Sequence, residues 1–282
     1  CIEMIMVLQS IVNGLIIGSC YALIAMGLNC VYSVMKIINF CQQDFMMVGM
    51  YIAYFAFTLL GIDPFITAIL VAVIMFLFGI VFQKTLVTPM LNRNADHHTM
   101  ILLTFGFGLL LQNLAQLFFT ADYRTIKTPL SSSMLKFGGV VVSKAKLLTF
   151  IIIVLIAIAL AIFYKKTKMG KMLRATSQNQ YGAQVIGIKT DRVYYMTFGI
   201  GTALAGAGGA LLLSFYYVYP SVGNMFGTTA FAVIMLGGLG NIFGAFIAGL
   251  GIGVLENISS LILGTSAFKT AIICFMFLSV LI

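Results

Sequence analysis

The chain has 282 residues, of which 61% are hydrophobic and only 8% are charged. This composition excludes an ordinary soluble domain, because a soluble surface of this size needs far more charge. The net charge of +9 does not indicate nucleic-acid binding, since the 16 Lys and Arg residues gather mainly in two loops without the interleaved aromatic residues of a nucleic-acid site. Cationic loops of this kind hold a membrane protein in one orientation in the lipid bilayer.

Uncharged apolar stretches recur along the chain, and several reach the roughly 20 residues that a helix needs to cross a bilayer. We predict a single all-α domain over residues 1–282, a polytopic membrane helix bundle with about eight transmembrane helices and one short broken or re-entrant helix. The predicted spans are 7–34, 45–60, 65–82, 99–119, 147–164, 194–217, 243–263 and 268–282, and the short helix covers 228–236. Because the chain begins at Cys1 and ends inside an apolar run, we expect that it is trimmed at both ends.

The connections between the predicted spans carry most of the charge. Residues 61–64 read Gly-Ile-Asp-Pro, which predicts a tight turn with a new helix beginning at the proline. A polar loop is expected between about 84 and 98, and we interpret His97 and His98 at its end as solvated. A short hairpin at the membrane surface suits the longer polar loop 120–146.

The two most basic loops, 120–146 and 165–192, flank one predicted span and therefore lie on opposite sides of the membrane. The second loop carries seven Lys or Arg residues and the first carries five. Because basic residues are enriched in cytoplasmic loops, we expect residues 165–193 inside the cell and residues 120–146 outside it. This pattern does not determine the side of the N-terminus, since that depends on whether the short helix crosses the membrane.

Small residues repeat at intervals of four in three of the predicted spans, which returns them to one helical face and lets helices approach closely in lipid. These repeats are Gly14 and Gly18, then Gly201, Ala205 and Gly209, and finally Ala245, Gly249 and Gly253. The cluster Gly237, Gly238 and Gly240, followed by Asn241, differs, because three glycines in four residues break a helix. A broken helix at membrane depth lies only against protein or a water-filled path. These four residues are therefore candidates for the translocation pathway or its gate.

Two groups of polar residues interrupt the apolar spans. Glu256 lies near the middle of the span 243–263, with Asn257 beside it, and a charge there costs roughly 2.5–3.5 kcal/mol on insertion scales. The second group comprises Asn39, Gln42, Gln43 and Asp44. An interhelical hydrogen-bonding cluster is the alternative reading for Glu256, and a loop at the membrane edge is the alternative for the second group. Our hypothesis is that both groups line or gate the route.

The sequence contains no recognised catalytic or metal-binding motif. HExxH, GxSxG and paired aspartates in adjacent spans are absent, and the five cysteines form no CxxC pair. We therefore expect no catalytic residues, no metal and no cofactor on this chain, and we set aside an intramembrane enzyme. The chain also lacks the GxxxxGK[ST] loop that binds ATP phosphates.

The segment 168–193 carries the most specific pattern in the chain. It reads as a pair of short cytosolic helices, with Ser177 as an N-cap and Gly187 as a helix stop. Ala183, Ile186 and Gly187 are spaced to lay one face against a partner. An ordinary positive-inside loop explains the charge of this segment but does not explain its small residues.

This segment resembles the coupling loop of permease subunits in ATP-binding-cassette (ABC) importers, and above all that of the branched-chain amino acid permease family, the LivH/LivM type. The matching positions are Gly170, Arg174, Ala175, Asn179 (where the family has an acid), Ala183, Gly187, Ile188 and Asp191-Arg192-Val193. Similar motifs recur along most of the chain, at Asn13-Gly14, Tyr21–Ala25, Ile38-Asn39-Phe40, Leu236–Gly240 and Glu256. Cys41-Gln42-Gln43 stands where the family has Ala-His-Gly.

The resemblance implies a permease subunit of the bacterial inner membrane that translocates branched-chain or related amino acids. It implies that the matching positions from Gly170 to Ile188 contact ATP-binding cassette subunits, which hold the ATP and Mg. A second permease subunit would complete the path, and an extracytoplasmic binding protein would deliver the substrate. The alternatives are a permease for another small solute, such as a sugar, urea or a nucleoside, and a secondary transporter or channel that needs no ATPase.

Overall fold

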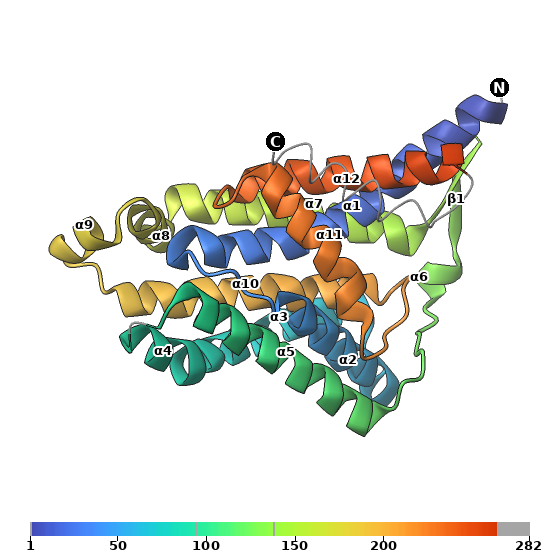
Figure 1. The fold of residues 1–282 in the computed structure, drawn as a ribbon. Helices are drawn as coiled ribbons and strands as arrows, with labels where there is room; N and C mark the ends of the chain where they lie inside the picture. Colours follow the sequence, from blue (N-terminus) through green and yellow to red (C-terminus); the bar gives the residue numbers. More distant parts are fainter. Residues whose placement is uncertain (1, 94, 138, 264–282) are drawn as a thin grey trace.

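The computed structural model describes residues 2–93, 95–137 and 139–263, and most of these residues are helical (Figure 1). Seven helical segments in the described part are long and apolar enough to cross a membrane, which confirms the predicted all-α polytopic bundle. The predicted span 268–282 lies outside the described residues. In chain order the elements are α1 (Ile2–Met35), α2 (Gln42–Leu60), α3 (Pro64–Phe82), η1 (Gln83–Val87), α4 (Thr88–Asn92), α5 (His97–Phe119), α6 (Pro129–Ser132), β1 (Met134–Phe137), β2 (Val140–Ser143), α7 (Lys144–Lys166), α8 (Lys168–Gln178), α9 (Gln180–Val185), α10 (Thr190–Leu212), α11 (Val222–Gly237) and α12 (Ile242–Leu263).

Helices α1 and α12 pack against each other through the small residues that repeat at intervals of four. A Cβ atom added to Gly14 would lie 2.6 Å from the Cα atom of Val254, and one added to Gly18 would lie 2.6 Å from the carbonyl oxygen of Gly249. Both distances are too short for a side chain, so only glycine permits this helix spacing. The prediction that these repeats mark helix contacts is confirmed for this pair.

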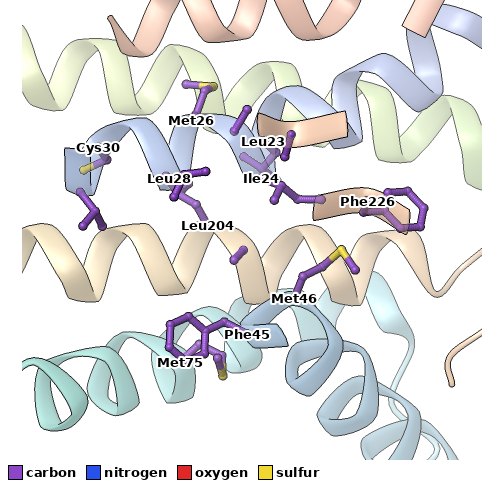
Figure 2. Packing of buried hydrophobic residues seen from close by; sticks show 14 of the residues in the cluster. Leu23, Ile24, Met26, Leu28, Cys30, Phe45, Met46, Met75, Leu204 and Phe226 are labelled. Carbon is purple, nitrogen blue, oxygen red and sulfur yellow. The ribbon is translucent and has the colours of Figure 1, made fainter. Parts of the chain in front are cut away.

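Helix α10 lies in the middle of the bundle and contacts α1, α2 and α3. A Cβ atom on Gly201 would lie 2.8 Å from the carbonyl oxygen of Gly27 on α1, so α1 and α10 also approach closely through glycine. Figure 2 shows the apolar core on both sides of α10, with Leu28 of α1 on one side and Phe45 of α2 on the other. The core therefore forms around this one helix.

Helix α3 ends at Phe82, where the predicted span ends, but the helical path of the backbone does not stop there. The backbone continues as the five-residue π-helix η1 and then as α4, which ends at Asn92. Pro89 lies in the first turn of α4 and lacks the N–H group that an α-helical hydrogen bond needs, and the wider π turn before it accommodates this defect. The predicted polar loop is correspondingly shorter, and α5 already begins at His97.

The six residues after α1 turn back into the bundle before α2 begins (Figure 1). The Phe40 N–H donates to the Thr104 Oγ1 atom on α5 at 3.3 Å. The Gln42 Nε2 atom donates at 2.8 Å to the carbonyl oxygen of Gly201, which lies at the middle of α10. Helix α2 thus begins inside the bundle, and the polar group that opens it is not a loop at the membrane edge.

Strands β1 and β2 pair antiparallel and form the predicted hairpin. The Gln9 side chain of α1 bonds to this hairpin twice: its Nε2 atom donates to the Val141 carbonyl oxygen and its Oε1 atom accepts from the Val141 N–H, both at 2.8 Å. Helices α8 and α9 lie at the opposite end of the bundle (Figure 1). The first turns of α1 therefore lie on the same side of the bundle as the loop 120–146. The charge pattern alone did not determine this placement of the N-terminal part.

Helix α11 is longer than the short helix predicted over 228–236, because it begins at Val222 and has 16 residues. At 1.5 Å per residue it is about 24 Å long, short of the roughly 30 Å hydrocarbon core. Gly223 and Gly227 weaken the helical pattern in sequence, but both pack against Gln43 of α2 where no larger side chain fits. Tertiary packing therefore adds a helical start that local propensity disfavours.

Candidate functional site

The break between α11 and α12 is held by one side chain from α1. The Asn29 Nδ2 atom donates to the carbonyl oxygens of Gly238 at 3.0 Å and Asn241 at 2.8 Å. The Asn29 Oδ1 atom accepts from the Gly240 N–H at 2.6 Å. Gly238 and Gly240 have φ angles of 88° and 90°, which L side chains rarely adopt. The predicted break is confirmed, and backbone groups that it frees bond to the side chain of Asn29 on α1.

Asn29 is completely buried, and our sequence analysis did not identify it as a site residue. A signal was present, because it is the only Asn or Gln between residues 14 and 38, within an apolar run. A lone amide in such a run needs a partner, since an unpaired polar group in the membrane costs several kcal/mol.

The four predicted residues of the break lie close to Asn29. Gly237 contacts α12 directly, and Asn241 caps α12 by accepting the Gly244 N–H at 3.0 Å.

Asn39 and Gln42 form the buried part of the second predicted polar group. The Asn39 Oδ1 atom accepts from the Cys41 N–H at 3.1 Å, and its Nδ2 atom donates to the Gln42 Oε1 atom at 3.4 Å. Through the bond from Gln42 to Gly201, these side chains join the start of α2 to the centre of α10. They stabilise the re-entry of the chain and are themselves closed off from the surface.

Gln43 and Asp44 belong to a second network that connects α2, α5 and α11. The Gln112 Nε2 atom of α5 donates to the Asp44 Oδ1 atom at 2.7 Å and to the Asn224 Oδ1 atom of α11 at 3.0 Å. The Gln43 Nε2 atom donates to the same Asn224 oxygen at 3.1 Å. We call Gln43, Asp44, Gln112 and Asn224 the α2–α5–α11 network. It contains the one carboxylate in this part of the described bundle, and sequence analysis missed Gln112 and Asn224.

The α2–α5–α11 network is reached from the surface of the chain. Asp44 is 2% exposed, whereas Gln43 and Gln112 are half-buried and Asn224 is exposed. Gly108 of α5 lies against the Asp44 carboxylate, so a larger residue there would displace it. Gln112 lies on α5, a membrane-spanning helix, where a partly exposed amide is unfavourable against lipid. This face therefore favours contact with a polar solute, with water or with another subunit.

Glu256 lies in a separate group on the other side of α11. Its carboxyl group is hydrogen-bonded to Tyr21 of α1. The ring of Tyr21 packs on Phe226 of α11 with centroids 5.6 Å apart, and Tyr216 packs on the same ring at 5.2 Å. The Asn257 Nδ2 atom donates to the Gly253 carbonyl oxygen of its own helix at 2.9 Å. The structure thus brings both predicted polar groups to α11 but not to each other.

The segment 168–193 forms the predicted pair of short helices, α8 and α9, but the N-cap of the second helix differs from the predicted one. The N-cap of α9 is Asn179, whose Oδ1 atom accepts from the Gly182 N–H at 2.8 Å, and not Ser177. The Ser177 hydroxyl instead donates to the Arg174 carbonyl oxygen one turn back, because Ser177 is still inside α8. Asn179 fits this position because a short amide side chain reaches the first free N–H groups of a helix.

A second correction concerns the face that this helix pair presents. Ala183 is only 3% exposed, whereas Ile186 is 72% exposed, so these residues do not share an outward face. Tyr181 and Val185 are exposed with Ile186 and make up the apolar surface of α9. Gly187 ends the turn after α9 with a φ angle of 84°, which confirms the predicted helix stop.

The other predicted coupling residues lie along α8 and the turn after α9. Gly170 packs on the backbone of Phe163 and Tyr164 at the end of α7 and admits no side chain. Arg174 is exposed, and Ala175 and Ile188 are half-buried. Helix α8 therefore rests on α7 through its glycine and leaves its cationic side open.

Together, a broken helix, a polar network inside the bundle and an exposed pair of short helices at one end define a polytopic membrane permease. The family model described as "Branched-chain amino acid transport system / permease component" matches residues 10–281, and the chain belongs to this family. No solved structure gives a significant match to the chain.

Several curated relatives match along nearly the whole chain. The high-affinity branched-chain amino acid transport system permease protein BraD of Pseudomonas aeruginosa is 32% identical, covering 91% of this chain and 87% of that protein. The permease LivH of the same kind of system in Salmonella typhimurium is 34% identical, covering 92% and 87%. A probable LivH permease of Methanocaldococcus jannaschii is 30% identical, covering 95% and 85%. These relatives are transport permeases and not enzymes.

Proposed function

We propose that this chain is the membrane-spanning permease subunit of an ATP-driven importer for branched-chain amino acids, in the bacterial inner membrane. The observation that carries the proposal is the family match over residues 10–281, which leaves no large part of the described bundle outside the family. The names of the relatives support the substrate class, since each is a permease of a branched-chain amino acid system.

The α8–α9 pair is the proposed coupling site for a cytosolic ATPase subunit. Its apolar surface of Tyr181, Val185 and Ile186 projects from the end of the bundle, and it is flanked by cations such as Arg174. Aromatic and apolar side chains of this kind bury well in a partner's cleft. ATP and Mg would bind those partner subunits, because this chain has no phosphate-binding loop.

The α2–α5–α11 network is the proposed wall of the translocation route. Its exposed face supplies amide donors and acceptors around one carboxylate at the depth where α2 begins. A second permease subunit would cover this face and complete the route between the two chains. A tilt of α11 relative to α12 at the break Gly238–Asn241 would open the route to one side at a time.

The test is transport by the reconstituted complex, with the permease, its ATPase subunits and its extracytoplasmic binding protein in proteoliposomes. We expect uptake of labelled leucine that requires ATP and the binding protein. Labelled ribose, urea and uridine serve as competing substrates in the same vesicles. Uptake of one of these in place of leucine would overturn the substrate class, and leucine uptake without ATP would overturn the importer mechanism.

A further inference from the structure

A cavity of about 400 Å³ lies at the end of the molecule that carries the β1–β2 hairpin. Its walls come from four segments: the first part of α1, residues 125–131 of the loop after α5, the hairpin with the start of α7, and residues 214–217 after α10. It is separate from the α2–α5–α11 network and from the α8–α9 pair. A volume of this size suits a small organic solute.

Among the described residues that line it, the cavity has one cation, Lys146. Lys146 lines it from the first turn of α7, and its ammonium group lies 5.9 Å from the centre of the Phe215 ring. None of the described residues that line the cavity is Asp or Glu. A cation in a concave site without a carboxylate partner attracts an anion, because the surrounding protein screens its charge less than water does.

A buried hydroxyl group reinforces this preference. Ser214 also lines the cavity and is 1% exposed, and its Oγ atom has no hydrogen-bond partner in the described structure. Leaving a buried donor unpaired costs about 1–3 kcal/mol. The neighbouring polar groups are already engaged, since the Gln9 amide bonds to Val141 and the Ser143 hydroxyl donates to the Ser131 carbonyl oxygen. Asn13, Thr125 and Tyr217 also line the cavity with polar side chains, but Lys146 supplies its positive charge and Ser214 its buried hydroxyl group without a described partner.

The loop that carries Ser214 also touches the helix beside the proposed route. Tyr216, two residues further on, packs on Phe226 of α11 and donates to the Met225 sulfur atom at 3.0 Å. The segment that lines the cavity is thus continuous with one that contacts α11. The cavity therefore lies on the Glu256 side of α11, next to a segment that contacts this helix.

We propose that this cavity binds the carboxylate group of a small organic acid, with the Lys146 ammonium and the Ser214 hydroxyl as donors. Charge-assisted hydrogen bonds to a carboxylate are the strong ones, which suits a donor pair of this kind. We assign the carboxylate to the amino acid that arrives from outside the cell, and this assignment rests on the proposed function. The headgroup phosphate of an anionic phospholipid is the other source of the same chemistry.

The test uses the full chain in nanodiscs of phosphatidylcholine, without the binding protein or the ATPase subunits. The probes are 4-methylpentanoate, which carries only the carboxylate of leucine, and 3-methylbutylamine, which carries only the amine. We expect saturation-transfer NMR to detect binding of the acid and not of the amine. Lys146→Gln should weaken binding of the acid about tenfold or more, and Ser214→Ala about threefold.

Lys144→Gln is the matched control. It removes the same charge two residues before Lys146, and the Lys144 side chain is exposed and does not line the cavity. Equal binding of acid and amine, or unchanged binding in Lys146→Gln, overturns the proposal. Displacement of the acid by leucine supports the substrate as the source of the anion. Displacement by added phosphatidylglycerol and not by leucine overturns that source. Leucine uptake by the full complex is measured separately, so failure of the cavity and failure of the proposed function are distinguishable.

Discussion

The side chain of Asn29 on α1 is bonded directly to the backbone of Gly240 in the break between α11 and α12. The Gly240 N–H donates to the Asn29 Oδ1 atom at 2.6 Å, and the Asn29 amide donates to two carbonyl oxygens of the same break. Two helices that end inside the bundle are thereby tied to a third. A single amide thus satisfies the backbone groups that a broken membrane helix leaves free.

Asn29→Ala is expected to destabilise the chain by about 2–4 kcal/mol, because it leaves several buried backbone groups without partners. Thermal unfolding of the protein in detergent measures the effect as a lower Tm. Asn113→Ala is the matched control, since the Asn113 amide is exposed and bonds only to the Leu109 carbonyl oxygen of its own helix. Equal Tm values for the two variants would show that Asn29 does not hold the break.

Two glycines on α12 are expected to respond oppositely to alanine. A Cβ atom on Gly249 would lie 2.6 Å from the Cα atom of Ala22 on α1, whereas one on Gly251 would meet nothing within 4 Å. Gly249→Ala should cost about 1–3 kcal/mol through forced separation of α1 and α12. Gly251→Ala should be neutral or stabilising by up to about 1 kcal/mol, because alanine favours the helix. Unfolding in detergent compares the two, and a stable Gly249→Ala variant would contradict the packing.

Asp44→Asn is expected to lower leucine uptake about tenfold or more while leaving the chain folded, because the amide can still accept from Gln112 but carries no charge. Uptake by the reconstituted complex is the measurement. Asp122→Asn is the control, since it removes the same charge from the loop 120–146, where the Asp122 carboxylate accepts from the Thr120 hydroxyl at 2.5 Å. Equal uptake in both variants would remove Asp44 from the route.

Glu256→Gln is expected to leave membrane expression intact and to lower ATP-driven uptake. The glutamate is 5% exposed and hydrogen-bonded to Tyr21, so the neutral variant keeps the shape of the group and loses its charge. Tyr21→Phe is the companion variant, because it removes the hydroxyl group and keeps the ring against Phe226. Normal uptake in Glu256→Gln would rule the glutamate out.

Tyr181→Glu is expected to abolish co-purification of the ATPase subunits without unfolding the chain. Tyr181 is 77% exposed on α9, so a charge there meets the proposed partner and not the core. Tyr123→Glu is the matched control, because Tyr123 is 71% exposed in the loop 120–146, away from α8 and α9. If Tyr181→Glu retains the ATPase subunits, α9 is not the coupling site. Ala183 is a poorer position for this test than Tyr181, since it is buried against its own chain.

The amino-acid sequence by itself determined the membrane class, seven of the predicted spans, the hairpin, the helix break and the α8–α9 pair. These features depend on local properties: apolar length, glycine content, turn residues and charge. The spacing of Gly14 and Gly18 also predicted a close helix contact, because small residues four apart share one face whatever helix lies opposite.

Only the tertiary structure decided where each polar residue points and which residues meet. Gln43 and Asp44 meet Gln112 and Asn224 across distances of 68 to 181 residues in sequence, and no local pattern specifies such pairs. The depth at which α2 begins, the start of α11 and the partner of Asn29 follow from the same long-range packing. The same packing determines which side chains remain available to a partner subunit. Ala183 faces the chain and Ile186 faces outward, although both lie in one short segment.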